Sequence, residues 1–279
     1  MLKLLGVSRS GYYSYKSRVK SKQAIKREKV KQEIKKEYEE SHSIYGAPKI
    51  HEKLKQRGIN VSARTVGVYM KQMGIKAHYR PKKTKTTINS DFSKTLVDLV
   101  NREFKPSRPN NIWVTDITYI WTKYDGFVYL TTVMDLFSRK IIAWDLSYTL
   151  EAESVVKCIK QAKKTRILDK PLIVHSDRGI QYVSKAYKTL FESNMTASYS
   201  RKGNPWDNAV IESFFAIIKR EWLSKFKILN YYHANALIFE YIETFYNTIR
   251  IHKSIGYKTP IEYEKGFKLS ETARLSLKS

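Results

Sequence analysis

The chain has 279 residues and a formal net charge of +26, because 52 Lys and Arg stand against 26 Asp and Glu. Hydrophobic residues make up 42% of it and aromatic residues 13%, enough to fill a core, so a disordered chain is excluded. No apolar run approaches the ~20 residues that span a bilayer, and the start lacks a signal-peptide pattern. A single cysteine, Cys158, excludes a disulfide framework and favours a reducing, cytoplasmic compartment without a membrane partner. The positive charge favours a nucleic-acid partner.

The positive charge is concentrated in the first third of the chain. Residues 1–90 carry 23 Lys and Arg against 6 Glu, which indicates a separate basic domain, expected over residues 1–77. Good helix formers without Gly or Pro predict a helix over 24–40. A basic linker is expected over residues 78–108, where it could also touch phosphates.

Two further helices are predicted over 47–58 and 59–74, the second with Ser62 as its N-cap. Because a short turn joins them, these helices indicate a helix-turn-helix. Its second helix would present Arg64 and Lys71 to DNA. The alternative is an ordinary helical hairpin whose basic side chains are merely solvated.

From residue 109 the pattern changes to strands, and a second domain is expected over 109–228, followed by a C-terminal helix and tail over 229–279. Alternation of β-branched and aromatic residues predicts three consecutive strands, after which helices and strands alternate. This order favours an α/β fold, a mixed sheet with helices on both faces. The expected strands are 111–121, 126–140, 141–148, 172–175 and 195–200, and the expected helices are 151–167, 182–193, 207–226 and 231–249.

Two carboxylates stand out in the predicted strands. Asp116 lies in the first strand, where a buried charge is costly unless it is paired or binds a cation. Asp177 follows the strand Leu172–His175, which can lie parallel beside the first strand and bring the two acids together. Repulsion between them would be relieved by a hard divalent cation. The alternative for Asp177 is a type I turn, since Ser-Asp-Arg-Gly suits one.

A third acid, Glu212, is expected on a late helix among apolar neighbours. Lys219 lies seven residues further along, so it shares that face and could meet a phosphate. A rim position for Glu212, paired with Lys219 or Arg220, is the alternative. Three carboxylates can hold two metal ions about 3.5–4 Å apart, as phosphodiester cleavage and strand transfer require.

Motifs throughout the chain resemble those of a known family. The motifs are YGAPKI, WVTDITYI, HSDRGIQY, SRKGNPWDNAVIESFFAIIKRE and YNTIRIHKSIGYKTPIEYE. Together they resemble the downstream-frame product (OrfB) of bacterial IS-three insertion-sequence transposases, and residues 109–228 resemble the ribonuclease-H-like core of retroviral integrases and DDE transposases. The resemblance implies that Asp116, Asp177 and Glu212 form the catalytic, metal-binding triad. The 34 residues between Asp177 and Glu212 are one fewer than is usual in such cores.

The resemblance also implies partners and a cofactor. Mg²⁺, with Mn²⁺ as a possible substitute, would serve cleavage and strand transfer on insertion-sequence ends and target DNA. A homo-oligomer on DNA, an upstream-frame (OrfA) partner or fusion, and a bacterial nucleoid location are expected. Because the chain begins at its own Met1 without the upstream part, a catalytically silent DNA-binding or regulatory protein is the alternative.

Several other side chains carry weaker expectations. Asp135 is expected in a turn, Glu221 in solvent, and Asp207 or Asn208 at a helix N-cap. His175 could orient a carboxylate, touch DNA or pack. Arg250 and His252 belong to either a DNA contact surface or a packed tail. Phosphate contacts are expected for four basic residues near the acids: Arg178, Arg201, Lys202 and Lys219.

Overall fold

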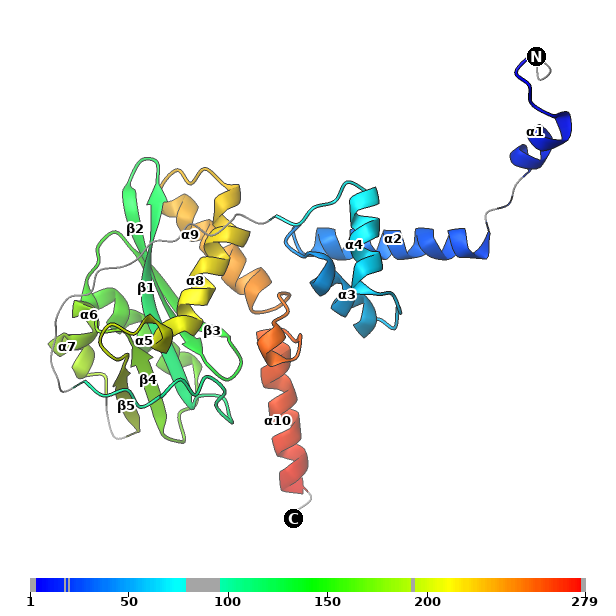
Figure 1. Ribbon diagram of the computed structural model, residues 1–279. Helices are drawn as coiled ribbons and strands as arrows, with labels where there is room; N and C mark the ends of the chain where they lie inside the picture. Colours follow the sequence, from blue (N-terminus) through cyan, green and yellow to red (C-terminus); the bar gives the residue numbers. More distant parts are fainter. Residues whose placement is uncertain (1–3, 18, 20, 79–95, 192–193, 277–279) are drawn as a thin grey trace. The chain divides into compact units, whose positions relative to one another are not determined.

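The computed structural model describes residues 4–17, 19, 21–78, 96–191 and 194–276. The chain divides into two compact units, Met1–His78 and Tyr79–Ser279 (Figure 1). The predicted contact of the linker with phosphates falls largely on residues 79–95, outside the described residues.

The first unit is helical. The Ser62 hydroxyl accepts a hydrogen bond from the Thr65 N–H at 3.1 Å, which confirms the predicted N-cap. Ile34, Ile50, Leu54 and Val66 are fully buried and hold three of the helices together. The helices are α1 (Arg9–Lys16), α2 (Lys22–Glu40), α3 (Ala47–Gln56) and α4 (Ala63–Gln72). The helix α1 was not predicted.

One arginine joins the acidic side of α2 to the end of α3. Arg57 Nη2 lies 2.6 Å from Glu37 Oε1 and 3.1 Å from Glu40 Oε2, and Arg57 Nη1 lies 3.2 Å from Glu33 Oε2. Glu37 is buried, and this burial raises the pKa of its carboxyl. The Arg57 guanidinium therefore offsets the cost of placing that acid inside the unit.

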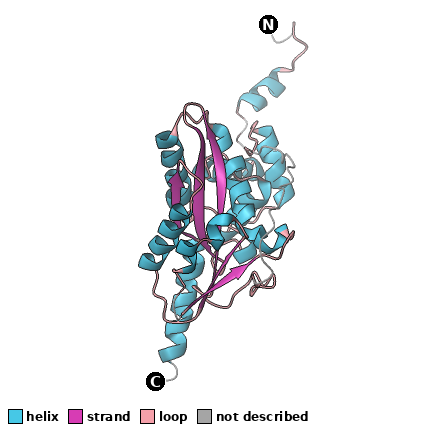
Figure 2. Cartoon of the chain, turned by 90° about the vertical axis from the view of Figure 1, so that its left-hand side faces the viewer, coloured by secondary structure: helices cyan, strands magenta, loops and turns pink. Residues whose placement is uncertain are grey.

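The second unit is built on a five-stranded mixed sheet of order β3-β2-β1-β4-β5. The central strand β1 pairs antiparallel with β2 and parallel with β4, as the sequence predicts for a mixed sheet. The magenta strands lie among helices in Figure 2. The strands are β1 (Ile112–Thr122), β2 (Gly126–Asp135), β3 (Ile141–Ser147), β4 (Leu172–Ser176) and β5 (Met195–Tyr199).

Helices cover both faces of this sheet. Helix α5 (Ala152–Thr165) packs its Cys158 and Ile159 with Trp113 of β1 in a hydrophobic core cluster. Helix α8 (Ala209–Glu221) lies against the opposite face, where Lys219 bonds to Thr118. The remaining helices are α6 (Ile180–Val183), α7 (Lys185–Lys188), α9 (Tyr231–Phe239) and α10 (Pro260–Ser276). None of the described helices is long and apolar enough to cross a bilayer.

Three predicted helices differ from those observed. The helix predicted over 182–193 is two short helices, because extended Ser184 ends α6 and caps α7 by accepting the Tyr187 N–H. The helix predicted over 207–226 is shortened to α8 by 3₁₀ turns at both ends, η1 (Pro205–Asn208) and η2 (Leu223–Lys225). The helix predicted over 231–249 is α9 followed directly by a π-helix, η3 (Glu240–Tyr246). The 3₁₀ turn η4 (Lys253–Ile255) comes after it.

The end of the predicted linker belongs to the sheet's unit. The Tyr199 N–H donates to the Val97 carbonyl at 2.9 Å, and the Leu99 N–H donates to Ser198 Oγ at 2.9 Å. Val100 is buried. Residues 96–108, which the sequence assigns to a linker, thus begin by packing along the edge strand β5.

Candidate active site

The parallel pairing of β1 with β4 brings two carboxylates to the same level. Val114 lies opposite His175, and side chains two residues further along each strand return to the same face. Those next side chains are Asp116 in β1 and Asp177 just after β4. The chain thus places the two predicted acids side by side on one face of the sheet.

Both acids are half-buried and held by backbone donors. Asp116 Oδ1 accepts the Ile117 N–H at 2.8 Å, and Asp177 Oδ1 accepts the Gly179 N–H at 2.9 Å. A Cβ on Gly179 would lie 3.1 Å from Asp177 Oδ1, so glycine suits this close approach. Burial, then the charge of Asp177, raises the pKa of Asp116 well above its usual value, and burial raises the pKa of Asp177.

The third predicted acid, Glu212, lies in the first turn of α8 and is exposed. Ile211, Phe214 and Phe215 are buried on the other side of the helix, so the expected apolar setting for Glu212 is wrong. Its charge nonetheless raises the pKa of Asp116. Among the residues that the structure describes, no three His, Cys, Asp or Glu side chains gather closely enough to hold a metal ion.

The Lys219 side chain extends from the last turn of α8 to the face of the sheet that carries Asp116 and Thr118. Its Nζ donates to Thr118 Oγ1 at 2.6 Å and lies 4.6 Å from the centre of the Tyr119 ring. Burial lowers the pKa of this amine to about 8, against the opposing effect of the Asp116 charge. A cation is therefore held beside Asp116, within the proposed acid site.

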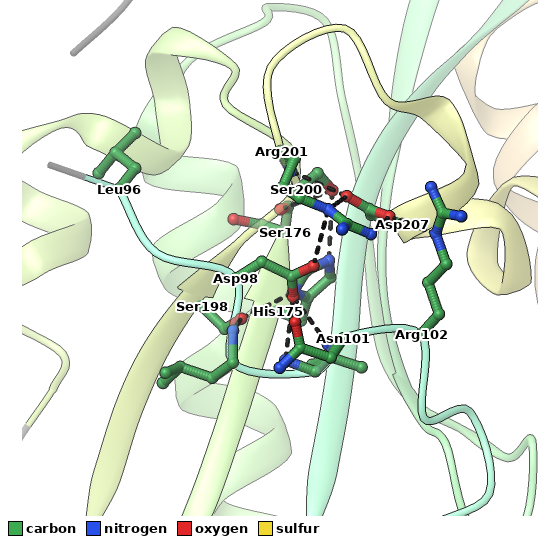
Figure 3. Close-up of polar contacts among 12 residues, drawn as sticks. Leu96, Asp98, Asn101, Arg102, His175, Ser176, Ser198, Ser200, Arg201 and Asp207 are labelled. Atoms are coloured by element: carbon green, nitrogen blue, oxygen red, sulfur yellow. Dashed lines mark hydrogen bonds and ion pairs between the residues drawn. The ribbon is translucent and has the colours of Figure 1, made fainter. Parts of the chain in front are cut away.

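A polar cluster surrounds the buried His175 of β4 (Figure 3). His175 is fully buried, with Nδ1 2.9 Å from Ser198 Oγ and Nε2 3.2 Å from Ser200 Oγ. Asp98 Oδ1 lies 3.9 Å from His175 Nδ1. These contacts place His175 in the packed interior. Asp98 was not predicted, because its contacts come from a segment read as linker and no local pattern marks them.

The same cluster continues to Asp207, just before α8. Asp207 Oδ1 accepts from Arg102 Nε at 2.8 Å and from Arg201 Nη2 at 2.8 Å. Its Oδ2 accepts the Arg201 backbone N–H at 3.0 Å. Asp207 is therefore the centre of an ion-pair network instead of a helix cap, and these hydrogen bonds hold its pKa well below the usual range. Asn208 occupies the N-cap position, but its side chain makes no capping hydrogen bond.

The predicted phosphate-binding residues occupy different settings. Arg201 is about half exposed and turned to Asp207 and Asp98, while Lys202 is exposed. Arg178 donates to the Ser200 carbonyl at 2.7 Å and to the Leu96 carbonyl at 3.0 Å, so it also joins backbone segments. In the first unit, Arg64 and Lys71 are exposed on α4.

Burial settles the open alternative for Arg250 and His252 in the C-terminal region. Arg250 is buried and its Nη2 lies 2.7 Å from Glu221 Oε1, while His252 is also buried. Both residues belong to packed structure, and the expectation that Glu221 faces solvent is wrong. Asp135 accepts the N–H groups of Asn110 and Phe137, which confirms its turn role, and burial raises its pKa to about 6.

The mixed sheet of order β3-β2-β1-β4-β5, with helices on both faces, has one acid in β1 and another just after β4. This arrangement defines a ribonuclease-H-like integrase core. Two models of the integrase core domain match residues 106–205 and 193–260, and an HTH-like domain model matches residues 26–83. The chain is 39% identical over 246 residues to the transposase for insertion sequence element IS904 of Lactococcus lactis subsp. lactis (strain IL1403), covering 88% of this chain and 97% of that protein.

It is also 31% identical over 268 residues to the transposase InsF for insertion sequence IS3A of Escherichia coli (strain K12), covering 95% and 92% of the two chains. Among solved structures, the HTLV-2 integrase catalytic core domain in complex with magnesium aligns with a TM-score of 0.44 at 19% identity, over 57% of this chain and 99% of that chain. The chain belongs to the insertion-sequence transposases with an integrase core domain.

Proposed function

We propose that this protein is a DDE transposase that cuts a DNA strand at the end of an insertion sequence and joins the freed 3′-OH to another DNA strand. The observation that carries the proposal is the parallel pairing of β1 with β4, which brings Asp116 and Asp177 close enough for the charge of Asp177 to raise the pKa of Asp116. Family membership supports the reaction class, and the strongly basic composition supports a DNA substrate.

The acids fit a hard divalent cation. Two half-buried carboxylates, close enough for the charge of Asp177 to raise the pKa of Asp116, are the kind of donor set that Mg²⁺ favours, and Mn²⁺ accepts the same oxygen ligands. Asp116 and Asp177 would hold the ion, and Glu212, exposed at the start of α8, would complete the set. When bound, a pair of such ions activates the attacking oxygen and stabilises the leaving oxygen.

The chain's own residues would position the DNA. Lys219, close enough to Asp116 to affect its titration, would bind a phosphate oxygen beside the acids. Lys202, exposed in the loop before α8, would bind the backbone further along. In the first unit, Arg64 and Lys71 project from α4, the second helix of the helix-turn-helix, and would contact DNA.

The partners follow from this reaction. Joining an element end to target DNA requires two DNA segments, and we propose that a homo-oligomer holds them. We further propose that an upstream-frame partner or fusion assists assembly on the element end. A requirement for that partner would show as activity that appears only when the upstream segment is added.

A strand-transfer assay tests the proposal. Purified protein is mixed with labelled element-end DNA and Mg²⁺ or Mn²⁺, with and without the upstream segment. Asp177→Asn and Glu212→Gln are compared with Glu153→Gln, an exposed first-turn acid of α5 that serves as a matched control. Joined products are expected from wild type and the control, and are expected to be lost in both site variants and in EDTA.

Equal product from wild type and Asp177→Asn would contradict the proposal. DNA binding without any joined product, even with the upstream segment present, would instead favour a DNA-binding protein without catalytic activity.

A further inference from the structure

Three large aromatic side chains form an exposed strip on the β1–β2 hairpin. Tyr119, Trp121 and Phe127, here called the aromatic strip, are 52%, 61% and 47% exposed. The Phe127 ring lies between the other two, with ring centres 5.3 Å from Tyr119 and 4.9 Å from Trp121 in edge-to-face contact. The strip is thus an ordered aromatic surface.

The strip is exposed because β1 extends beyond the part of the sheet that α5 covers. Ile120 and Thr122, which alternate with the strip residues, are buried on the opposite face. Tyr119 and Trp121 are on the α5 face, but the residues of β1 that share the core with α5 are Trp113 and Ile117, nearer its start. Clustered exposed aromatic surface of this kind marks an interaction site.

The aromatic strip and the proposed acid site lie on opposite faces of β1, close to the edge of β1 that β4 leaves unpaired. The pairing of β1 with β4 ends at Val114 and His175, so the following residues of β1 have no β4 partner. Asp116 points to one face and the strip to the other. At about 3.3 Å per residue, Tyr119 lies about 10 Å and Trp121 about 17 Å beyond Asp116 along the strand.

Cations border this path. Lys219 contacts both Thr118 on the acid face and the Tyr119 ring on the strip face. Lys123, exposed at the turn of the hairpin, lies with its Nζ 4.4 Å from the centre of the Tyr124 ring. Aromatic rings bordered by Lys side chains match single-stranded DNA, which presents base faces for stacking and phosphates for the cations.

We propose that the aromatic strip stacks the bases of unpaired nucleotides next to the phosphodiester held at the acids. This inference rests on the proposed function, since it places that phosphodiester at Asp116 and Asp177. At about 3.4 Å per nucleotide, 10–17 Å corresponds to roughly three to five nucleotides. The strip would hold the end of the strand open while its backbone passes Lys219.

A binding experiment separates stacking from charge. Asp177→Asn protein in EDTA, which keeps the DNA intact, is titrated with a fluorescent duplex that carries a single-stranded tail. In a second DNA the tail nucleotides three to five from the junction are abasic, which removes the bases and keeps the phosphates. The first unit contributes equally to both affinities, so their ratio reports on the tail alone.

The intact tail is expected to bind about tenfold more tightly than the abasic tail, because one stacked base contributes on the order of 1–3 kcal/mol. Adding Trp121→Ala should abolish this preference and leave affinity for the abasic tail unchanged. Trp121→Phe should restore most of it. Tyr232→Ala, which removes another exposed aromatic side chain, is the matched control and should keep the preference.

Equal affinity for the two tails in the parent protein would overturn the inference. So would a loss of both affinities in Trp121→Ala, which would indicate a general defect. A change in oligomeric mass with the tail preference intact would make the strip a protein interface instead. Because the assay needs neither metal nor cleavage, its failure is distinguishable from failure of the proposed reaction.

Discussion

Asp116 in β1 and Asp177 just after β4 each lie two residues beyond Val114 and His175, the last paired residues of these adjacent parallel strands. Their carboxylates come from positions 61 residues apart in the chain, yet the charge of Asp177 raises the pKa of Asp116. Two like charges therefore repel each other at the site where the catalytic acids of the family are expected.

Removing one of the two charges should increase the free energy of unfolding. In the absence of metal, Asp177→Asn should be more stable than wild type at pH 8, by about 0.5–2 kcal/mol, the common range for a single stabilising substitution. The amide oxygen can still accept the Gly179 N–H. Urea denaturation followed by tryptophan fluorescence measures the difference, with Glu153→Gln as the control.

The pH dependence of that difference has a definite sign. A carboxyl whose folded pKa is raised contributes stability below its unfolded pKa of about 3.9, and loses it as the pH rises through the folded value. The advantage of Asp177→Asn should thus be absent below about pH 4 and grow with pH. An advantage that is constant from pH 4 to pH 8 would contradict the raised pKa.

The contribution of Asp207 to stability should depend on pH in the opposite direction. Its pKa is held low by hydrogen bonds from Arg201 and Arg102, so its contribution is present above an unfolded pKa of about 3.9 and is lost as the pH falls. Asp207→Asn should cost about 1–3 kcal/mol at pH 7, the range for charge-assisted hydrogen bonds lost from a buried partner. Denaturation at pH 7 and pH 3 checks both statements.

The same variant should also lower strand transfer, because Asp207 precedes α8 and so positions Glu212. Wild-type activity in Asp207→Asn would show that the network stabilises the unit without positioning the acid.

Arg64 and Lys71 should act on DNA affinity and its salt dependence. Each phosphate contact removed from B-DNA reduces the slope of log K against log salt by about 0.9. The double variant Arg64→Ala, Lys71→Ala should therefore bind duplex DNA more weakly, with a slope reduced by up to about two. Lys35→Ala, an exposed lysine of α2, is the control. An unchanged slope in the double variant would support the solvated hairpin.

Arg57 should act on stability. Arg57→Ala leaves the buried Glu37 carboxyl without its closest cation, which should cost about 1–3 kcal/mol. Thermal unfolding followed by circular dichroism measures the loss. Arg64→Ala should leave the transition of the first unit unchanged, since Arg64 is exposed.

Local patterns predicted what depends on neighbours in sequence. Alternation in β1 located Asp116, and the short apolar run of β4 placed Asp177 at its end. Ser62 was predicted as a cap because capping involves residues only three apart. These features need little knowledge of tertiary contacts.

Contacts between distant segments were beyond such patterns. Asp98 meets His175 and Arg201 only after the chain folds, and Arg250 finds Glu221 across 29 positions. The apolar neighbours of Glu212 in the sequence predict an apolar setting, whereas the helical turn directs its side chain outward. The π-helix after α9 likewise gave no local signal, and its residues Tyr241, Phe245 and Tyr246 are buried.

The central claim is that Asp116 and Asp177 together hold a divalent cation. Its most direct test is electron paramagnetic resonance of Mn²⁺ titrated into the full chain, where the free-ion signal falls as the metal binds. Wild type should take up Mn²⁺, and the double variant Asp116→Asn, Asp177→Asn should leave the signal at its free-ion level. Equal uptake by the two proteins would contradict the account.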